Sequence, residues 1–265
     1  MKTAEYFAAY PVFSLDEATQ ILQPPGGRSG TVERLKHHLE SQRLKLVARG
    51  VYAVVPAGIP AERFQPDPFL VASAARPDAV FSHHSALELL GAAHSVWREY
   101  TLYTRRRRRP LSLLGARIRF LDYPTQMQDG QARNFGTRKV ERHARLLKTT
   151  GPERTLVEGF RRPNLTGGLQ ELVLSASGFS TLDLNLLEEI LARYNVANLW
   201  AATGWFLERF HNSFHVPGDL LERLARHRPR SPQYLERGQR GGTLAARWNL
   251  IISQALIQRG EPDER

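Results

Sequence analysis

Eight side chains between residues 28 and 49 have the chemistry to bind a phosphate group or the edge of a base. Guanidinium, ammonium, imidazole and hydroxyl groups donate hydrogen bonds to phosphate oxygens, and an arginine also binds guanine through two parallel hydrogen bonds. The eight residues are Arg28, Ser29, Thr31, Arg34, His37, Arg43, Lys45 and Arg49. The sequence therefore predicts a surface for double-stranded DNA in this segment.

Two helices joined by a turn are expected to position the first five of these residues. Ser14 and Glu17 have the spacing of a capping box, in which the hydroxyl accepts from a backbone N–H and the carboxylate reaches back to the cap. The segment 24–27, Pro-Pro-Gly-Gly, ends this first helix because proline lacks a backbone donor and glycine adopts positive φ. A helix that follows such a turn is typical of a helix-turn-helix.

The second helix is predicted over residues 31–42, where Val32, Leu35 and Leu39 form an apolar stripe. Its N-terminal end has free backbone N–H groups that favour a phosphate, and this end of a recognition helix usually enters the major groove. Residues 43–55 are rich in β-branched residues and turn near Gly50, which predicts a hairpin carrying the last three basic residues. This order predicts a winged helix-turn-helix domain over residues 1–60.

A change in composition after residue 56 indicates a second domain. Proline and glycine recur between residues 56 and 68, which predicts a linker and places the second domain at 66–265. Strands are expected at 79–81, 99–104, 116–121 and 146–150, and helices at 69–75, 82–91, 169–177, 183–194, 197–210 and 218–226. An extended segment at 246–252 is expected to return to the sheet. The fold class is therefore mixed α/β (α+β), with a helical C-terminal part.

Five adjacent arginines, Arg105, Arg106, Arg107, Arg108 and Arg109, form the densest charge run of the chain. Their mutual repulsion disfavours a buried element, so we expect them at a hairpin tip between two strands. One interpretation is a solvated loop. The other is a phosphate clamp or a docking patch for an acidic or RNA-bound partner, and the sequence leaves both open.

A further helix is predicted to begin at Pro152, since proline is favoured at the first helical position. Glu153 and Arg154 lie in its first turn, where they can pair with other segments and fix the helix against the sheet.

Three segments together resemble the AbiEi family, the antitoxins and transcriptional regulators of abortive-infection systems. They are the hairpin segment 46–53, the helix start Ser82-His83-His84-Ser85-Ala86-Leu87, and Thr150-Gly151-Pro152-Glu153-Arg154-Thr155-Leu156-Val157-Glu158-Gly159. The similarity extends from Phe13 to about Ile252, and the last segment is its most specific part.

The resemblance implies a type IV toxin-antitoxin function. The winged helix would bind inverted repeats in the promoter and repress the antitoxin–toxin operon, and the second domain would act as antitoxin. The functional partner would be a nucleotidyltransferase-like toxin, which such antitoxins counter without needing a stable complex. The DNA-reading role falls on Arg28, Ser29, Thr31, Arg34, His37 and, on the wing, Arg49.

Two other functions remain open from the residues. A DNA-tethered nuclease needs clustered carboxylates around a metal, and the candidates near predicted strands are Asp122, Glu141, Glu153 and Glu158. None of them has a recognisable spacing followed by a catalytic lysine. The alternative is an adaptor that binds RNA or protein through the arginine run.

Histidine pairs are expected to be structural. His83 and His84 are adjacent, so on a helix their side chains diverge, and we expect capping and surface polarity there. His211 and His215 have the spacing of a helical metal pair, but the sequence around them indicates that the helix is ending. We therefore expect no metal, no cofactor and no enzymatic activity.

Composition supports a polyanion as partner. The chain has 265 residues, 37 Lys and Arg against 26 Asp and Glu, and a formal net charge of +11, which favours salt-sensitive attraction to nucleic acid. It has no cysteine, which excludes disulfides and thiolate metal sites. No apolar run approaches the roughly 20 residues needed to cross a bilayer, and no signal-peptide core begins the chain. We therefore expect a cytoplasmic protein that does not bind membranes.

Overall fold

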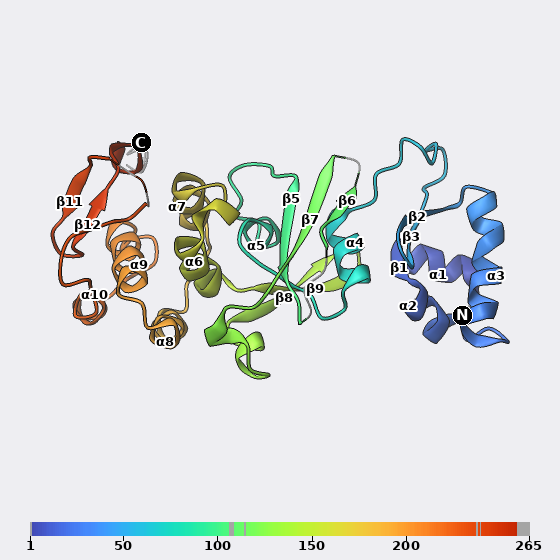
Figure 1. Ribbon diagram of the computed structural model, residues 1–265, viewed down its shortest axis with the longest axis horizontal. Coiled ribbons are helices and arrows are strands. Elements are labelled where there is room, and N and C mark those ends of the chain that lie inside the picture. The colour runs from blue at the N-terminus through green and yellow to red at the C-terminus, as the bar shows by residue number, and fades with distance from the viewer. Residues whose placement is uncertain (1, 106–108, 114, 237, 239, 259–265) are drawn as a thin grey trace. The chain divides into compact units, whose positions relative to one another are not determined.

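The computed structural model describes residues 2–105, 109–113, 115–236, 238 and 240–258 (Figure 1). It confirms a mixed α/β fold. The helices are α1 (Thr3–Ala9), α2 (Leu15–Leu22), α3 (Gly27–Glu40), α4 (Pro68–Ala75), α5 (His84–Leu89), α6 (Pro152–Arg161), α7 (Leu169–Ser177), α8 (Leu184–Tyr194), α9 (Ala197–Arg209), α10 (Gly218–Ala225) and α11 (Gln254–Gln258). Short 3-10 helices are η1 (Thr125–Met127), η2 (Ala132–Asn134) and η3 (Pro163–Leu165).

The strands form three sheets. They are β1 (Val12–Ser14), β2 (Leu44–Ala48), β3 (Val51–Val54), β4 (Val80–Phe81), β5 (Glu99–Tyr103), β6 (Leu111–Leu113), β7 (Ala116–Leu121), β8 (Thr137–Arg142), β9 (Arg145–Thr150), β10 (Gln233–Tyr234), β11 (Thr243–Ala245) and β12 (Leu250–Ile252). The strand orders are β1-β3-β2, β6-β7-β5-β4-β9-β8 and β10-β12-β11.

The chain divides into two compact units. The first comprises Met1–Val80, Arg98–Asp122 and Lys139–Lys148, and the second comprises Phe81–Trp97, Tyr123–Arg138 and Thr149–Arg265. These units differ in extent from the domains expected at 1–60 and 66–265, and that boundary stays a prediction.

The first 55 residues have winged helix-turn-helix topology, in the order α1, β1, α2, α3, β2, β3. The sequence interpretation missed α1 and β1, because a seven-residue helix and a three-residue strand are too short to show periodicity. Strand β1 pairs antiparallel with β3, with Phe13 opposite Tyr52. The fully buried Tyr6 of α1 packs edge-on against Phe13, so α1 closes the core of this domain.

Helix α2 begins at the predicted cap, where the Ser14 hydroxyl accepts from the backbone N–H of Glu17 at 3.1 Å. The Glu17 carboxylate, which the capping box would return to the cap, instead accepts from two nitrogens of Arg145 at 2.7 and 3.2 Å. A charge-assisted pair with a guanidinium is stronger than a bond to a neutral N–H. The tertiary contact with Arg145 therefore replaces the hydrogen bond from the Glu17 carboxylate to the cap, which is one of the two bonds of the predicted capping box.

Helix α3 begins at Gly27, four residues before the predicted start at Thr31. Gly26 has a φ of +80° at the cap position, so the turn between the helices is complete by residue 26. Arg28 and Ser29 consequently lie in the first turn of the helix instead of preceding it.

The wing is the predicted hairpin. Strands β2 and β3 pair antiparallel, and Gly50 between them has a φ of +73°, a conformation that glycine adopts without strain. The register shifts between Leu46 and Ala48, which bends the hairpin locally.

The two strands that flank the arginine run, β5 and β6, are not neighbours in the sheet, so they do not form the hairpin that was expected there. Strands β5 and β7 are parallel, and β6 is inserted between them in sequence to form the antiparallel hairpin with β7. The run therefore belongs to the connection from β5 to β6. Arg106, Arg107 and Arg108 lie outside the described residues.

The second unit contains most of the predicted helices at the expected places. Helix α6 starts at Pro152, and all its residues from Pro152 to Phe160 are buried. Trp200 and Trp205 of α9 are buried packing residues, as predicted. The extended segment near residue 250 does not return to the large sheet, because β12 pairs with β10 and β11 instead. In the part of the chain that the structure describes, no helix is long and apolar enough to cross a membrane.

Gly204 allows α9 to pack directly on Trp248. A Cβ at this position would lie 2.1 Å from the Cζ3 atom of Trp248, whose side chain is fully buried. The helix needs glycine here because the indole ring occupies the space of a side chain.

We expect Gly204→Ala to lower the free energy of unfolding by about 1–3 kcal/mol, since overpacking outweighs the gain in helix propensity. Urea titration followed by circular dichroism measures this change. Gly218→Ala in α10 is the matched control, because a Cβ there meets no atom within 4 Å. A G204A variant as stable as the control would contradict this packing.

Candidate nucleic-acid interface

Buried side chains set which face of α3 is exposed. Leu35 is 1% exposed and Thr31 is completely buried, so both face the core of the winged-helix domain. The Thr31 hydroxyl donates to the carbonyl of Gly27 at 3.0 Å and accepts from the hydroxyl of Thr19 at 3.0 Å. Thr31 was therefore wrongly predicted as a DNA-contacting side chain, because its hydroxyl joins α3 to α2.

The predicted apolar stripe of α3 is also corrected. Leu39 packs against the core as expected, but Val32 is 45% exposed, and Thr31 takes its place on the buried face. Thr31 and Leu35 are separated by four residues, the spacing of one helical face. Because threonine is polar, a search for apolar periodicity does not detect the buried face formed by Thr31 and Leu35.

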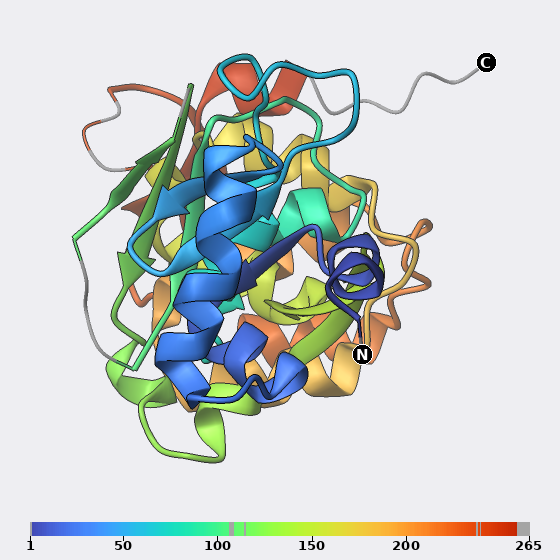
Figure 2. The same cartoon turned by 90° about the vertical axis from the view of Figure 1, so that its right-hand side faces the viewer.

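The opposite face of α3 carries a polar stripe. Counting 100° per residue from Thr31 and Leu35, this face consists of Ser29, Glu33, Lys36, His37 and Glu40, and all five are exposed. Arg34 is exposed at its side. Figure 2 shows α3 facing the viewer. Sequence reasoning identified Ser29, Arg34 and His37 but missed Glu33 and Lys36, which helical counting from Leu35 would have found.

Four exposed cations on α3 and the wing form no ion pair with another described residue. They are Arg34, Lys36, Arg43 and Arg49. Cations without internal partners keep their full electrostatic attraction for an external anion. We call these four side chains the free cation group.

Two predicted contact residues have internal partners instead. Arg28 forms an ion pair with Asp16 of α2. The Lys45 ammonium donates to the carbonyls of Ala61 and Phe64 at 2.8 and 3.0 Å. Lys45 therefore secures the segment after the wing, and its assignment as a DNA contact is not supported by its position.

Arg105, the first residue of the arginine run, has a structural contact through its backbone. The backbone N–H of Arg105 donates to the Asp78 carboxylate at 2.8 Å, and Asp78 also pairs with Arg76 at 2.6 Å. These contacts hold the beginning of the connection, and they lower the pKa of Asp78 against the effect of its burial. The binding role of the run stays a prediction.

The carboxylates considered for a nuclease do not form a metal site among the described residues, where no group of three His, Cys, Asp or Glu side chains is positioned to hold an ion. Glu153 accepts from the backbone N–H of Asp183 at 2.8 Å and from Arg138 at 3.3 Å. Glu158 accepts from Arg154 and from Tyr194. The absence of enzymatic activity stays a prediction.

The adjacent histidines are buried, which corrects the expectation of surface polarity. His83 is 0% and His84 1% exposed. His84 stacks on the Trp97 ring at 4.9 Å, and its Nε2 atom lies 3.4 Å from Glu171. His83 has a φ of +54° and lies within hydrogen-bond distance of the Ser82 hydroxyl, at 3.0 Å. His211 lies beyond the end of α9 at Arg209, as expected.

The most specific motif of the sequence, residues 150–159, forms a buried polar network. Arg154 is 0% exposed, and its Nε donates to Glu158 at 2.7 Å. Its Nη1 donates to the carbonyls of Arg133 and Phe135 at 3.1 and 2.9 Å. Burial beside the Glu158 carboxylate raises the pKa of Tyr194, whose hydroxyl donates to Glu158 at 2.6 Å. The motif therefore has the structural role that its first-turn charges predicted.

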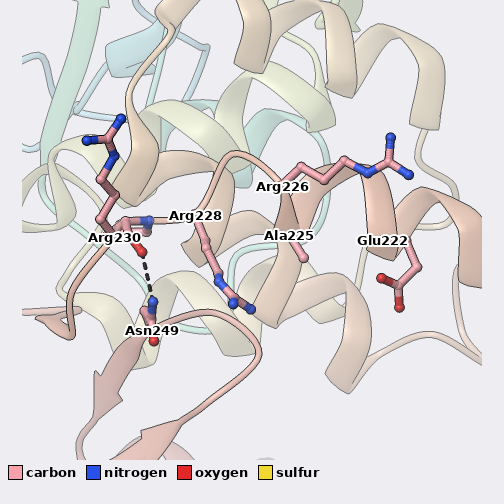
Figure 3. Close-up of a pocket in the computed structure, with 7 residues that line it drawn as sticks. Glu222, Ala225, Arg226, Arg228, Arg230 and Asn249 are labelled. Carbon is pink, nitrogen blue, oxygen red and sulfur yellow. Dashed lines mark hydrogen bonds between the residues drawn. The ribbon is translucent and has the colours of Figure 1, made fainter.

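An open pocket of about 480 Å³ lies at the C-terminal end of α10. Its lining includes Arg226, Arg228, Arg230 and Asn249. Figure 3 shows the arginine side chains extending in different directions, and the Asn249 amide donating to the carbonyl of Pro229 at 2.8 Å. The guanidinium groups do not converge on one point, so this arrangement by itself defines no ligand.

Comparison with known proteins identifies the fold alone. No family model matches the sequence, and no curated protein matches it. The structure is similar to the crystal structure of the RV2827C protein from Mycobacterium tuberculosis, with a TM-score of 0.58 and 18% sequence identity. The similarity covers 94% of this chain and 89% of that chain. The chain therefore resembles that protein in fold.

We expect Arg154→Met to destabilise the protein by about 3–5 kcal/mol, since it leaves the Glu158 carboxylate buried without its cation. Urea titration monitored by tryptophan fluorescence measures the change. Arg119→Met is the control, because its ion pair with Glu99 is partly exposed, at 36% and 26% of the two side chains, and such pairs contribute about 0–1 kcal/mol. Equal effects of the two substitutions would refute the importance of the buried network.

We expect the protein to lose stability as the pH falls from about 6.5 to 4. Burial lowers the pKa of His83 to about 4, so in this range the unfolded chain binds a proton that the folded chain does not. His83→Gln should reduce the slope of unfolding free energy against pH in this range. His211→Gln, which removes an exposed histidine, is the matched control. An unaltered slope in H83Q would contradict the assignment.

Proposed function

We propose that this protein is a sequence-specific DNA-binding transcriptional repressor. The observation that carries the proposal is the free cation group, Arg34, Lys36, Arg43 and Arg49, on the second helix and wing of a winged helix-turn-helix. Helix α3 would enter the major groove with its N-terminal half, as recognition helices do. The wing would contact the sugar-phosphate backbone through Arg43 and Arg49.

We further propose that the protein is an AbiEi-type antitoxin that represses its own operon by binding inverted repeats in the promoter. Two observations support this assignment. The motif 150–159 is the most specific segment of the family resemblance, and its residues organise the buried network around Arg154. The element order, a winged helix followed in the chain by mixed α/β elements, agrees with what the family resemblance implies. The functional partner would be a nucleotidyltransferase-like toxin, countered without a stable complex.

Promoter binding is tested by titrating the full chain against its own upstream promoter and a scrambled duplex at several salt concentrations. We expect a tighter complex with the promoter that persists at moderate salt. Arg49→Ala should weaken binding to both duplexes and reduce the salt slope by about one, because a phosphate contact is lost. Arg223→Ala is the control, since Arg223 is occupied by Glu188 and Asp219.

Equal binding to both duplexes that vanishes with salt would overturn the repressor assignment. Repeating the titration with Mg²⁺ and examining the DNA for cleavage tests the nuclease alternative in the same experiment. Growth rescue of cells that express a nucleotidyltransferase-like toxin tests the antitoxin role separately. A chain that binds the promoter but does not rescue growth is a repressor without antitoxin activity.

A further inference from the structure

A carboxylate occupies the centre of the exposed face of α3. Glu33 lies four residues after Ser29 and four before His37, so the three residues are stacked along one face of the helix. Glu33 is exposed, and it makes no hydrogen bond or ion pair with another residue that the structure describes. The structural contacts of the domain therefore do not require a glutamate at this position.

The chemistry of DNA limits what a carboxylate can contact at this position. Phosphate oxygens repel it, and so do the acceptor atoms of guanine and thymine in the major groove. Cytosine presents its N4 amino group there as a donor, and glutamate or aspartate accepts from it. Adenine also has an amino donor, but its N7 acceptor lies beside it, which suits an amide side chain better than a carboxylate.

The position of Glu33 along α3 favours base contact over a role at the helix end. The N-terminal residues of a recognition helix contact base edges, and Glu33 is the seventh residue of the 14-residue helix. Glu40, on the same face, is the last residue of α3. Glu40 therefore carries the same charge at the C-terminal end of the helix, where contact with bases is not expected.

We propose that Glu33 determines operator specificity by accepting a hydrogen bond from cytosine N4 in each half-site. This inference rests on the proposed repressor function. Glu33 lowers affinity for DNA in general by repelling phosphates and raises it for a site with cytosine at one position. The neighbouring Lys36 and Arg34 supply the attraction that holds the helix in the groove.

Selection of duplexes from a random pool by the full-length protein tests the proposal, with wild type, Glu33→Gln and Glu40→Gln compared. We expect the wild type and E40Q to enrich cytosine at the same position. E33Q should lose this preference and shift toward adenine, because an amide pairs with adenine N6 and N7. Direct titration should then show a cytosine-over-thymine preference that falls by about 5- to 150-fold in E33Q.

The failures are distinguishable. A wild type that enriches no sequence overturns the repressor function and this inference together. A wild type that enriches a site, with E33Q enriching the same cytosine, overturns only the role of Glu33. Glutamate and glutamine have similar helix propensities and the position is exposed, so E33Q is expected to fold. Its circular dichroism spectrum, compared with that of wild type, checks this.

Discussion

The second unit depends on the burial of one guanidinium group. Placing a cation in a protein interior costs several kcal/mol unless acceptors surround it, and here the acceptors come from separate parts of the chain. Arg154 of α6 binds the carbonyls of Arg133 and Phe135 and the carboxylate of Glu158, and Glu158 in turn binds Tyr194 of α8. One side chain therefore fixes the positions of two helices and an irregular segment. Glycine suits the adjacent position 136 for two reasons: its φ is +61°, and a Cβ there would lie 3.0 Å from Cδ1 of Ile190 and 3.3 Å from Cβ of Arg154.

In the winged-helix domain the corresponding constraint is the rotation of α3. Thr31 and Leu35 hold one face of the helix against the core, so the opposite face and its carboxylate at Glu33 are presented outward. A rotation by one residue, about 100°, would bury a charged side chain and expose Leu35. Because burying a charge and exposing Leu35 are both unfavourable, the packing of α3 against the core determines which of its residues face outward.

Ion pairing within the fold then separates structural cations from those available to a ligand. Lys45 lies in the same segment as Arg34 and Arg49, but its ammonium donates to the carbonyls of Ala61 and Phe64, whereas Arg28 is paired with Asp16 at an exposed position. Net charge alone does not distinguish the two groups. The free cation group therefore contains fewer residues than the number of basic residues in this segment of the sequence indicates.

Local signals in the sequence determined the fold class, the order of helices and hairpin, the cap at Ser14 and the start of α6 at Pro152, because capping, turn formation and periodicity act over a few residues. The tertiary structure decided which side chains point outward and which charges are paired. The Thr31 hydroxyl bonds to Thr19 on the buried side of α3, and the Glu17 carboxylate pairs with Arg145 instead of the helix cap. The strand after Asn249 pairs with β10 in a separate sheet. The partners in these contacts lie 12 to 128 residues away in the chain, beyond the reach of any local pattern.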